Sequence, residues 1–204
     1  MNAWQNPYYQ QGPYYQRQPY YPPGYGFPPQ APMNGPPPAH SKKWPNLHSA
    51  LAADSTTIRY DLRKKPQEDI LGTTFLAIRH ASAMAYAASH IRLISKSFLW
   101  TIDIVVQGPI TVEMVLDALH QGLQQPLVDS EWGMIVADKK LRESVEKAGK
   151  ARAEKDGEKA LKRIDYLGDA THFRGLEKIE DFEKLRLLPG KPAVGETWVV
   201  KLSS

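Results

Sequence analysis

The chain has 204 residues, a formal net charge of +4, 17 prolines and no cysteine. This length has room for one domain and an appendage. The lack of cysteine excludes disulfides, thiolate metal sites and thiol catalysis. The sequence begins without the basic and apolar stretches of a signal peptide and contains no apolar run long enough to span a bilayer. We therefore expect a cytoplasmic protein, with the nucleus as an alternative, that is not secreted and not in a membrane.

Residues 1–45 differ sharply in composition from the rest of the chain. They hold 12 of the 17 prolines and 7 of the 10 tyrosines, with almost no Ile, Leu or Val. Such a segment cannot bury enough apolar surface to offset the entropy lost on ordering. We predict a disordered Pro/Tyr/Gln-rich tail over 1–45, partly in the polyproline II conformation. Residues 44–48 then lead into a compact domain over 46–204.

Alternation of apolar and polar residues predicts several strands. In 57–63, Ile58, Tyr60 and Leu62 fall on one face, with charged residues on the other. Further strands are expected at 91–95, 100–106, 163–167 and 172–176, and around Trp198 and Val200. Residues 70–90 stay open, because 75–78 fit a short strand while the alanine-rich run 81–88 fits a helical turn or a packed loop.

The clearest helix pattern begins after Thr111, whose hydroxyl suits a helix N-cap. Apolar residues follow at helical spacing: Val112, Val115, Leu116, Leu119 and Leu123. This spacing predicts an amphipathic helix packed on a sheet, ending at Gln125-Pro126.

A second helix is predicted to begin at Glu131 with Asp129 or Ser130 as its cap. Its apolar stripe is expected to comprise Met134, Ala137, Leu141, Val145 and Ala148. Residues 177–196 are predicted to form a long loop. Strands, two helices and further strands indicate an α+β fold: a mainly antiparallel sheet of about five strands with two helices packed on one face, preceded by the disordered tail.

Six short motifs come in a set order along the chain: YDLR at 60–63, WTIDI at 100–104, TVEMVLDAL at 111–119, IDYLG at 164–168, FRGL at 173–176 and WVV at 198–200. Together they resemble the fungal proteins grouped as domain of unknown function 6699, over about residues 47–203. Tyr60 departs from the tryptophan that is common there. The resemblance implies a fungal source, but no established reaction, cofactor or catalytic residue.

The polar residues show no catalytic motif: HExxH, GxSxG, P-loop and GxGxxG patterns are all missing. His80 and His90 are candidate metal ligands. Asp169 with His172 could form an acid–base pair, but a polar hairpin turn explains this pair more simply. Asp103 and Asp165 fit either cross-strand salt bridges or a charged patch that binds a partner. We expect no catalytic residue, no cofactor, no metal and no enzymatic activity.

The tail suggests a binding function. Pro22, Pro23 and Tyr25 form a Pro-Pro-x-Tyr motif, the ligand pattern of WW domains. A Pro-Tyr-Tyr repeat every six residues places Tyr8, Tyr14 and Tyr20 on one side of a polyproline II helix. Our leading hypothesis is a non-enzymatic protein-interaction module of unknown partner, whose arm recruits WW-type domains or self-associates.

The alternative is RNA binding. Residues 146–163 contain seven cations and four anions. In this interpretation the basic side chains follow the phosphates while tail tyrosines stack on bases. The candidate contacts are Lys147, Lys150, Arg152, Lys155 and Lys159. A solvated helix face is the simpler explanation of such a mixed run.

Overall fold

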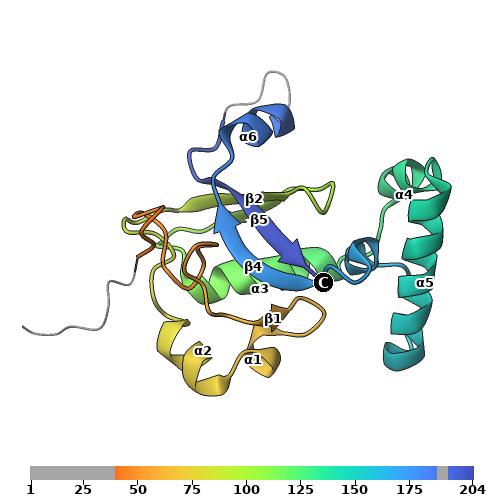
Figure 1. The fold of residues 1–204 in the computed structure, drawn as a ribbon, viewed down its shortest axis with the longest axis horizontal. Coiled ribbons are helices and arrows are strands. Elements are labelled where there is room, and N and C mark those ends of the chain that lie inside the picture. The colour runs from red at the N-terminus through yellow and green to blue at the C-terminus, as the bar shows by residue number, and fades with distance from the viewer. Residues whose placement is uncertain (1–39, 188–192) are drawn as a thin grey trace, which may run out of the picture. The chain divides into compact units, whose positions relative to one another are not determined.

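The computed structural model describes residues 40–187 and 193–204, which belong to one compact unit (Figure 1). The tail contacts predicted from the sequence lie outside the described residues: Tyr8, Tyr14, Tyr20, Pro22, Pro23 and Tyr25. Residues 40–45 are described and pack on the domain. Ser41 is buried, its hydroxyl donates to Asp54, and the Trp44 ring meets Trp198 edge to face at 6.4 Å.

Five strands form one mixed sheet in the order β1–β4–β5–β2–β3. The strands are β1 (Tyr60–Asp61), β2 (His90–Ser95), β3 (Ile102–Val105), β4 (His172–Glu177) and β5 (Thr197–Ser203). The central β2–β5 pair is parallel, whereas the other three pairs are antiparallel. Because its central pair is parallel, the sheet is mixed, and the prediction of a mainly antiparallel sheet is wrong. Alternating residues identify strands but not their neighbours, and β5 inserts between β4 and β2 instead of adding to an edge.

The predicted strand faces agree with burial, although one predicted strand is a helix. Ile58, Tyr60 and Leu62 are all buried, yet only two residues of that stretch join the sheet. Residues 163–167 form the 3-10 helix η1 (Arg163–Leu167). The Asp165 carboxylate accepts the Lys162 N–H at 2.8 Å at its start. A five-residue apolar pattern fits either element, and this cap favours the helical one.

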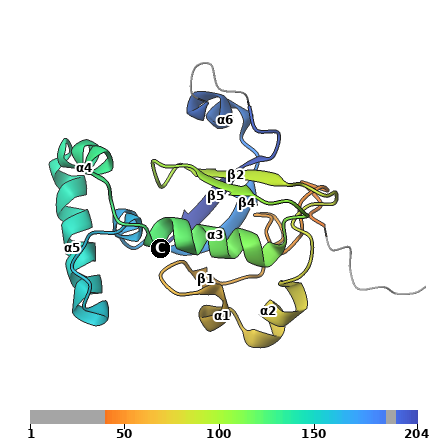
Figure 2. The same ribbon diagram turned by 180° about the vertical axis from the view of Figure 1, so that it is seen from behind.

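Helix α3 (Val112–Gln124) confirms the clearest sequence prediction. The Thr111 Oγ1 accepts the backbone N–H of Met114 at 3.3 Å, which satisfies one orphan donor of the first turn. All five predicted apolar residues are fully buried. They pack with Ile91 and Leu93 in the main core, so α3 covers one face of the sheet (Figure 2).

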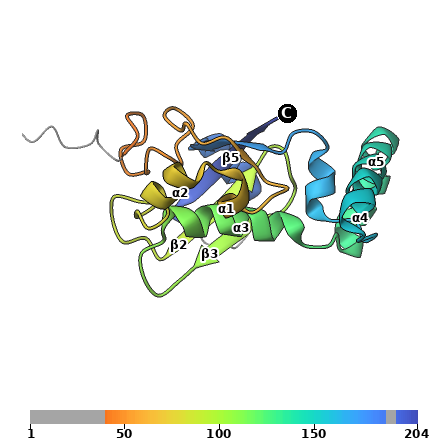
Figure 3. The same cartoon turned by 90° about the horizontal axis from the view of Figure 1, so that it is seen from below.

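The predicted second helix is in fact two, α4 (Asp129–Val136) and α5 (Lys139–Asp156). Asp138 separates them, because its carboxylate accepts the N–H groups of Lys140 and Leu141 and thereby starts a new helix. Both helices pack against each other and α5 packs on η1, to one side of the sheet (Figures 1 and 3). The expectation of two helices on one sheet face is therefore wrong, since only α3 of the expected pair lies there.

The cap and the apolar stripe of α4 also differ from the prediction. Its N-cap is Val128, whose N–H is accepted by Glu131 at 3.2 Å, and neither Asp129 nor Ser130 caps it. Ile135 is fully buried, whereas Met134 is 56% exposed. Because the chain breaks between α4 and α5, the helical spacing of apolar residues does not continue from one helix to the next, and the buried face of α4 differs from the predicted one.

The stretch 70–90, whose structure the sequence left open, contains a helix and a loop, and a further short helix precedes it. Helices α1 (Pro66–Asp69) and α2 (Gly72–Ile78) are short, so 75–78 is not a strand. Residues 81–88 form a loop that buries Ala83, Met84 and Ala88. No helix among the described residues has the length and apolar character required to cross a bilayer.

Two further elements complete the domain. Residues 47–56 lie along β4, where Gly175 at φ 98° passes the backbone of Ala53 so closely that a Cβ would come within 2.5 Å. Helix α6 (Glu180–Arg186) lies within the predicted 177–196 loop and borders the sheet face opposite α3, beside Ile94.

Candidate functional site

Most half-buried charged groups in the described domain have a partner of opposite charge within it. The closest arginine pairs are Arg163–Glu131 at 2.6 Å, Arg63–Asp61 at 2.7 Å, Arg92–Asp103 at 2.8 Å, Arg152–Asp165 at 2.9 Å and Arg79–Glu113 at 3.1 Å. A buried charge is costly unless it is paired, so these contacts are what folding requires. The charges of these pairs are therefore explained by the fold.

Asp103 belongs to such a pair on the open sheet face. It accepts hydrogen bonds from Arg92 and His90 of the neighbouring strand at 2.8 and 3.0 Å. Burial alone would raise the pKa of Asp103, but these hydrogen bonds outweigh it and hold the pKa below its usual value. Asp103 thus makes cross-strand ion pairs, whereas Asp165, which was expected beside it, lies in η1.

Among the half-buried arginines of the described domain, Arg186 at the end of α6 is the exception. Its Nη2 donates to the backbone carbonyls of Leu99 and Trp100, the latter at 3.2 Å, and its guanidinium lies 5.8 Å from the Phe182 ring. Burial lowers the pKa of Arg186, but an arginine remains protonated at neutral pH. No carboxylate among the described residues lies within salt-bridge distance of it.

Arg186 lies where two pockets meet. One, of about 810 Å³, is bordered by the 86–90 loop, β2 and residues 193–196. The other, of about 280 Å³, lies beneath α6 against Ile94 and Thr197. They share Arg92, Arg186 and residues 193–194, so the two pockets lie side by side along β2. We call the two together the α6 groove.

The mouth of the α6 groove is fixed by one carboxylate. Glu196 accepts hydrogen bonds from the Tyr86 hydroxyl and from the Trp198 Nε1 at 3.1 Å. Burial, followed by the bond to Glu196, raises the pKa of Tyr86 to about 12. The tyrosine therefore stays neutral and holds the 86–90 loop to the strand that follows residues 193–196.

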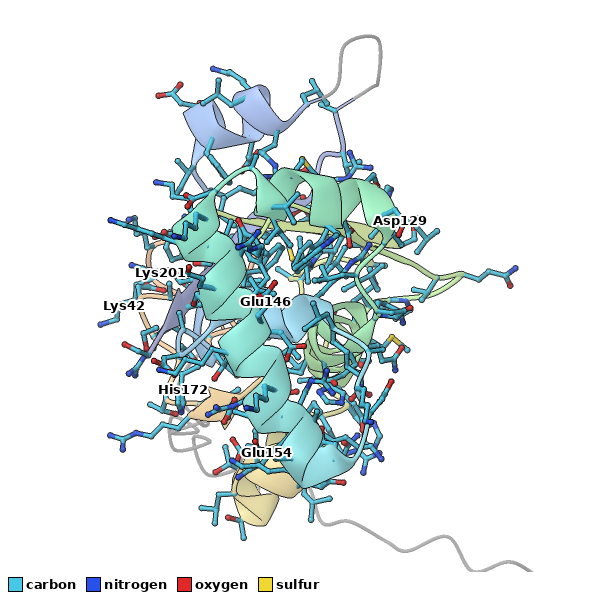
Figure 4. All side chains as sticks on the ribbon, turned by 90° about the vertical axis from the view of Figure 1, so that its right-hand side faces the viewer. Lys42, Asp129, Glu146, Glu154, His172 and Lys201 are labelled. Atoms are coloured by element: carbon cyan, nitrogen blue, oxygen red, sulfur yellow. The ribbon has the colours of Figure 1, made fainter. Side chains whose placement is uncertain are left out.

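The cations proposed to bind RNA do not form a uniform basic surface. Arg152 is turned inward, with its side chain 10% exposed against Asp165. The other four, Lys147, Lys150, Lys155 and Lys159, are exposed, and we call them the four lysines. Glutamates alternate with them, including Glu146 and Glu154 along α5 (Figure 4).

The histidines predicted as weak candidates are dispersed. His80 lies 4.0 Å from Glu113, whereas His90 binds Asp103. His172 lies on β4, while Asp169 is exposed in the preceding turn. Within the two described ranges, no group of three or more potential ligand side chains is placed to hold a metal ion.

The family model for the Family of unknown function (DUF6699) matches residues 58–183, more than half of the chain. The chain belongs to this family. The DUF6699 match includes the 86–90 loop and β2, but not Arg186 or residues 193–197. No curated protein and no solved structure shows significant similarity to the chain.

Sequence reasoning missed Arg186 because 177–196 was assigned to a loop. A signal for α6 was present: Glu180 and Asp181 lie in its first turn, and Lys184 and Arg186 in its last. This charge order complements the helix dipole. The position of Arg186 over the β2–β3 connection had no local signal, because it depends on contacts distant in sequence.

Proposed function

We propose that the protein is a non-enzymatic protein-interaction module with two contact regions. The α6 groove holds an extended segment of a partner protein. The arm at 1–45 recruits WW-type domains through Pro22, Pro23 and Tyr25 or self-associates through its tyrosine pairs. The two regions together would tether one molecule to the domain and another to the arm.

The α6 groove is the observation that carries this proposal. It is open, it follows the direction of a strand, and β2 at its floor is fixed between two neighbouring strands. A hollow of this form suits an extended chain better than a small molecule, which is usually enclosed on most sides. Its polar groups are available for hydrogen bonds along such a chain.

A displayed random peptide library selected on the full chain would test the groove. Ala193 borders both pockets, so Ala193→Trp would place an indole inside the groove. Ala77→Trp, on the exposed side of α2, is the matched control. We expect wild type and Ala77→Trp to enrich the same peptides and Ala193→Trp to lose them. Failure of the wild type to enrich any peptide would refute groove binding.

The arm requires a separate test with isolated WW domains as bait. Tyr25→Ala removes the motif tyrosine, and Tyr21→Ala is a control outside the motif. We expect Tyr25→Ala alone to reduce retention, because the tyrosine and the prolines together fill the aromatic groove of a WW domain. Equal retention of both variants would remove the motif from consideration.

RNA binding is the second proposal, and it is less well supported. The four lysines are exposed and available to phosphates. Arg152, however, is engaged with Asp165, and the glutamates between the lysines would repel a phosphate backbone.

A further inference from the structure

We propose that the α6 groove recognises an acidic side chain of the bound segment, with Arg186 as the anchoring cation. This inference rests on the proposed function, since it requires that the groove bind a protein segment. It adds the chemical identity of the residue that is recognised.

Arg186 lacks a counter-charge within the described domain. None of the described carboxylates lies within 4.0 Å of its guanidinium, although the domain pairs its other half-buried arginines with acids. Residues 1–39 and 188–192 contain no Asp and no Glu, so they cannot supply one either. Glu183, one turn earlier on the same helix, is not paired with Arg186 in the structure, so a bound segment would supply the carboxylate that Arg186 lacks.

Arg163, like Arg186, lies against Trp100. Its guanidinium lies 5.1 Å from the Trp100 ring, and Glu131 pairs with it at 2.6 Å. Arg186 donates to the carbonyl of the same Trp100. Among the described residues, its Nη2 has acceptors, whereas its Nε and Nη1 have none. An incoming carboxylate would form an ion pair with Arg186, as Glu131 does with Arg163.

The surroundings of Arg186 combine carboxylates and apolar side chains. One oxygen of Glu183, one turn earlier on α6, is buried without a donor among the described residues, so Arg186 does not engage it. Ile94, Leu187 and Val194 border the smaller pocket and suit an apolar side chain. The groove therefore fits an extended segment in which an acidic residue adjoins an apolar one.

The same surroundings favour a carboxylate over a phosphate. Glu180, Glu183 and Glu196 all border the groove. A phosphorylated side chain carries nearly two negative charges at neutral pH and would be repelled more strongly than a carboxylate.

Four peptide libraries of equal length would test the inference, each with degenerate flanks around a fixed central Glu, Gln, Lys or phosphoserine. Binding to the full chain is measured by fluorescence anisotropy. We expect the Glu library to bind wild type about tenfold more tightly than the Gln library, as one charge-assisted hydrogen bond provides. Arg186→Gln should bring this ratio close to one, and Arg186→Lys should retain part of it.

Arg59→Gln is the matched control, because Arg59 is an exposed arginine beside the edge strand β1. It should leave the ratio unchanged. Since both libraries are measured on the same variant, any loss of folded protein cancels in the ratio. Equal binding of the Glu and Gln libraries to wild type, persistence of the preference in Arg186→Gln, or a preference for phosphoserine would overturn the inference and leave groove binding intact. Failure of all four libraries to bind would refute groove binding itself.

Discussion

Replacing Arg152 by methionine distinguishes a structural from an RNA-binding role for this residue. The Arg152 Nε and Nη2 donate to the two oxygens of Asp165 at 2.9 and 3.0 Å, and Asp165 is 3% exposed. Methionine keeps much of the aliphatic length but removes the charge and the donors. The substitution would therefore leave a buried carboxylate without its cation.

Breaking a buried ion pair by removing one partner costs about 3–5 kcal/mol. Asp165 would keep the Lys162 backbone N–H at 2.8 Å, which places the expected loss near the lower end, about 3 kcal/mol. Lys150 is exposed on the same helix, and Lys150→Met should change the free energy of unfolding by no more than about 0.5 kcal/mol.

Urea unfolding of the full chain at pH 7, followed by far-UV circular dichroism, measures both values. A double-mutant cycle with Asp165→Asn separates the pair from other effects, and we expect the double variant to lose clearly less than the sum of the single losses. If Arg152→Met and Lys150→Met were equally stable, the assignment of Arg152 to the fold would be wrong and its availability to RNA would have to be reconsidered.

Three further predictions follow from packing, titration and charge. Gly175→Ala should destabilise the domain by about 2–5 kcal/mol, because alanine is strained at a φ of 98° and its Cβ would displace the backbone of Ala53. Gly133→Ala is the control: its Cβ would meet nothing within 4 Å, so it should be neutral or stabilising. Thermal unfolding of both variants measures the difference. Burial, and secondarily His40, lowers the pKa of His48 below its ordinary 6.5, so its stabilising contribution is complete above pH 6.5 and is lost as the pH falls toward the lowered value. His48→Asn keeps an acceptor for the Ala50 N–H, and a stability profile between pH 7 and 5 identical to wild type would contradict this role. For RNA, we expect no measurable affinity for a single-stranded probe at roughly 100 mM salt; binding that weakens steeply with salt and disappears when the four lysines become glutamine would favour the RNA proposal instead.

The sequence predicted those elements whose signal is local. Helix α3 has five apolar residues at helical spacing and a threonine cap, and each of these features is visible within one window. The buried face of 57–63 was equally readable, because alternate residues of an extended chain point to opposite sides. These predictions needed no knowledge of what the elements pack against.

Features that depend on distant contacts were missed. The parallel pairing of β2 with β5 joins residues about a hundred positions apart, and no local pattern encodes it. Residues 163–167 form a helix because Asp165 caps it and Arg152 of α5 holds that carboxylate in place. The candidate site was missed for the same reason, since the unpaired state of Arg186 is evident only once every carboxylate of the domain has been located.

The position of β5 affects how the polypeptide can be shortened or synthesised. The matched segment 58–183 ends before this strand, yet β5 lies between β4 and β2 and hydrogen-bonds to both. A fragment cut at residue 183 would retain β2 and β4 but lose the strand that lies between them. The unpaired backbone N–H and C=O groups of both strands would then be exposed and would promote aggregation. During translation, the sheet can close only after β5 (Thr197–Ser203) has been synthesised, so β2 and β4 lack their shared neighbour until then.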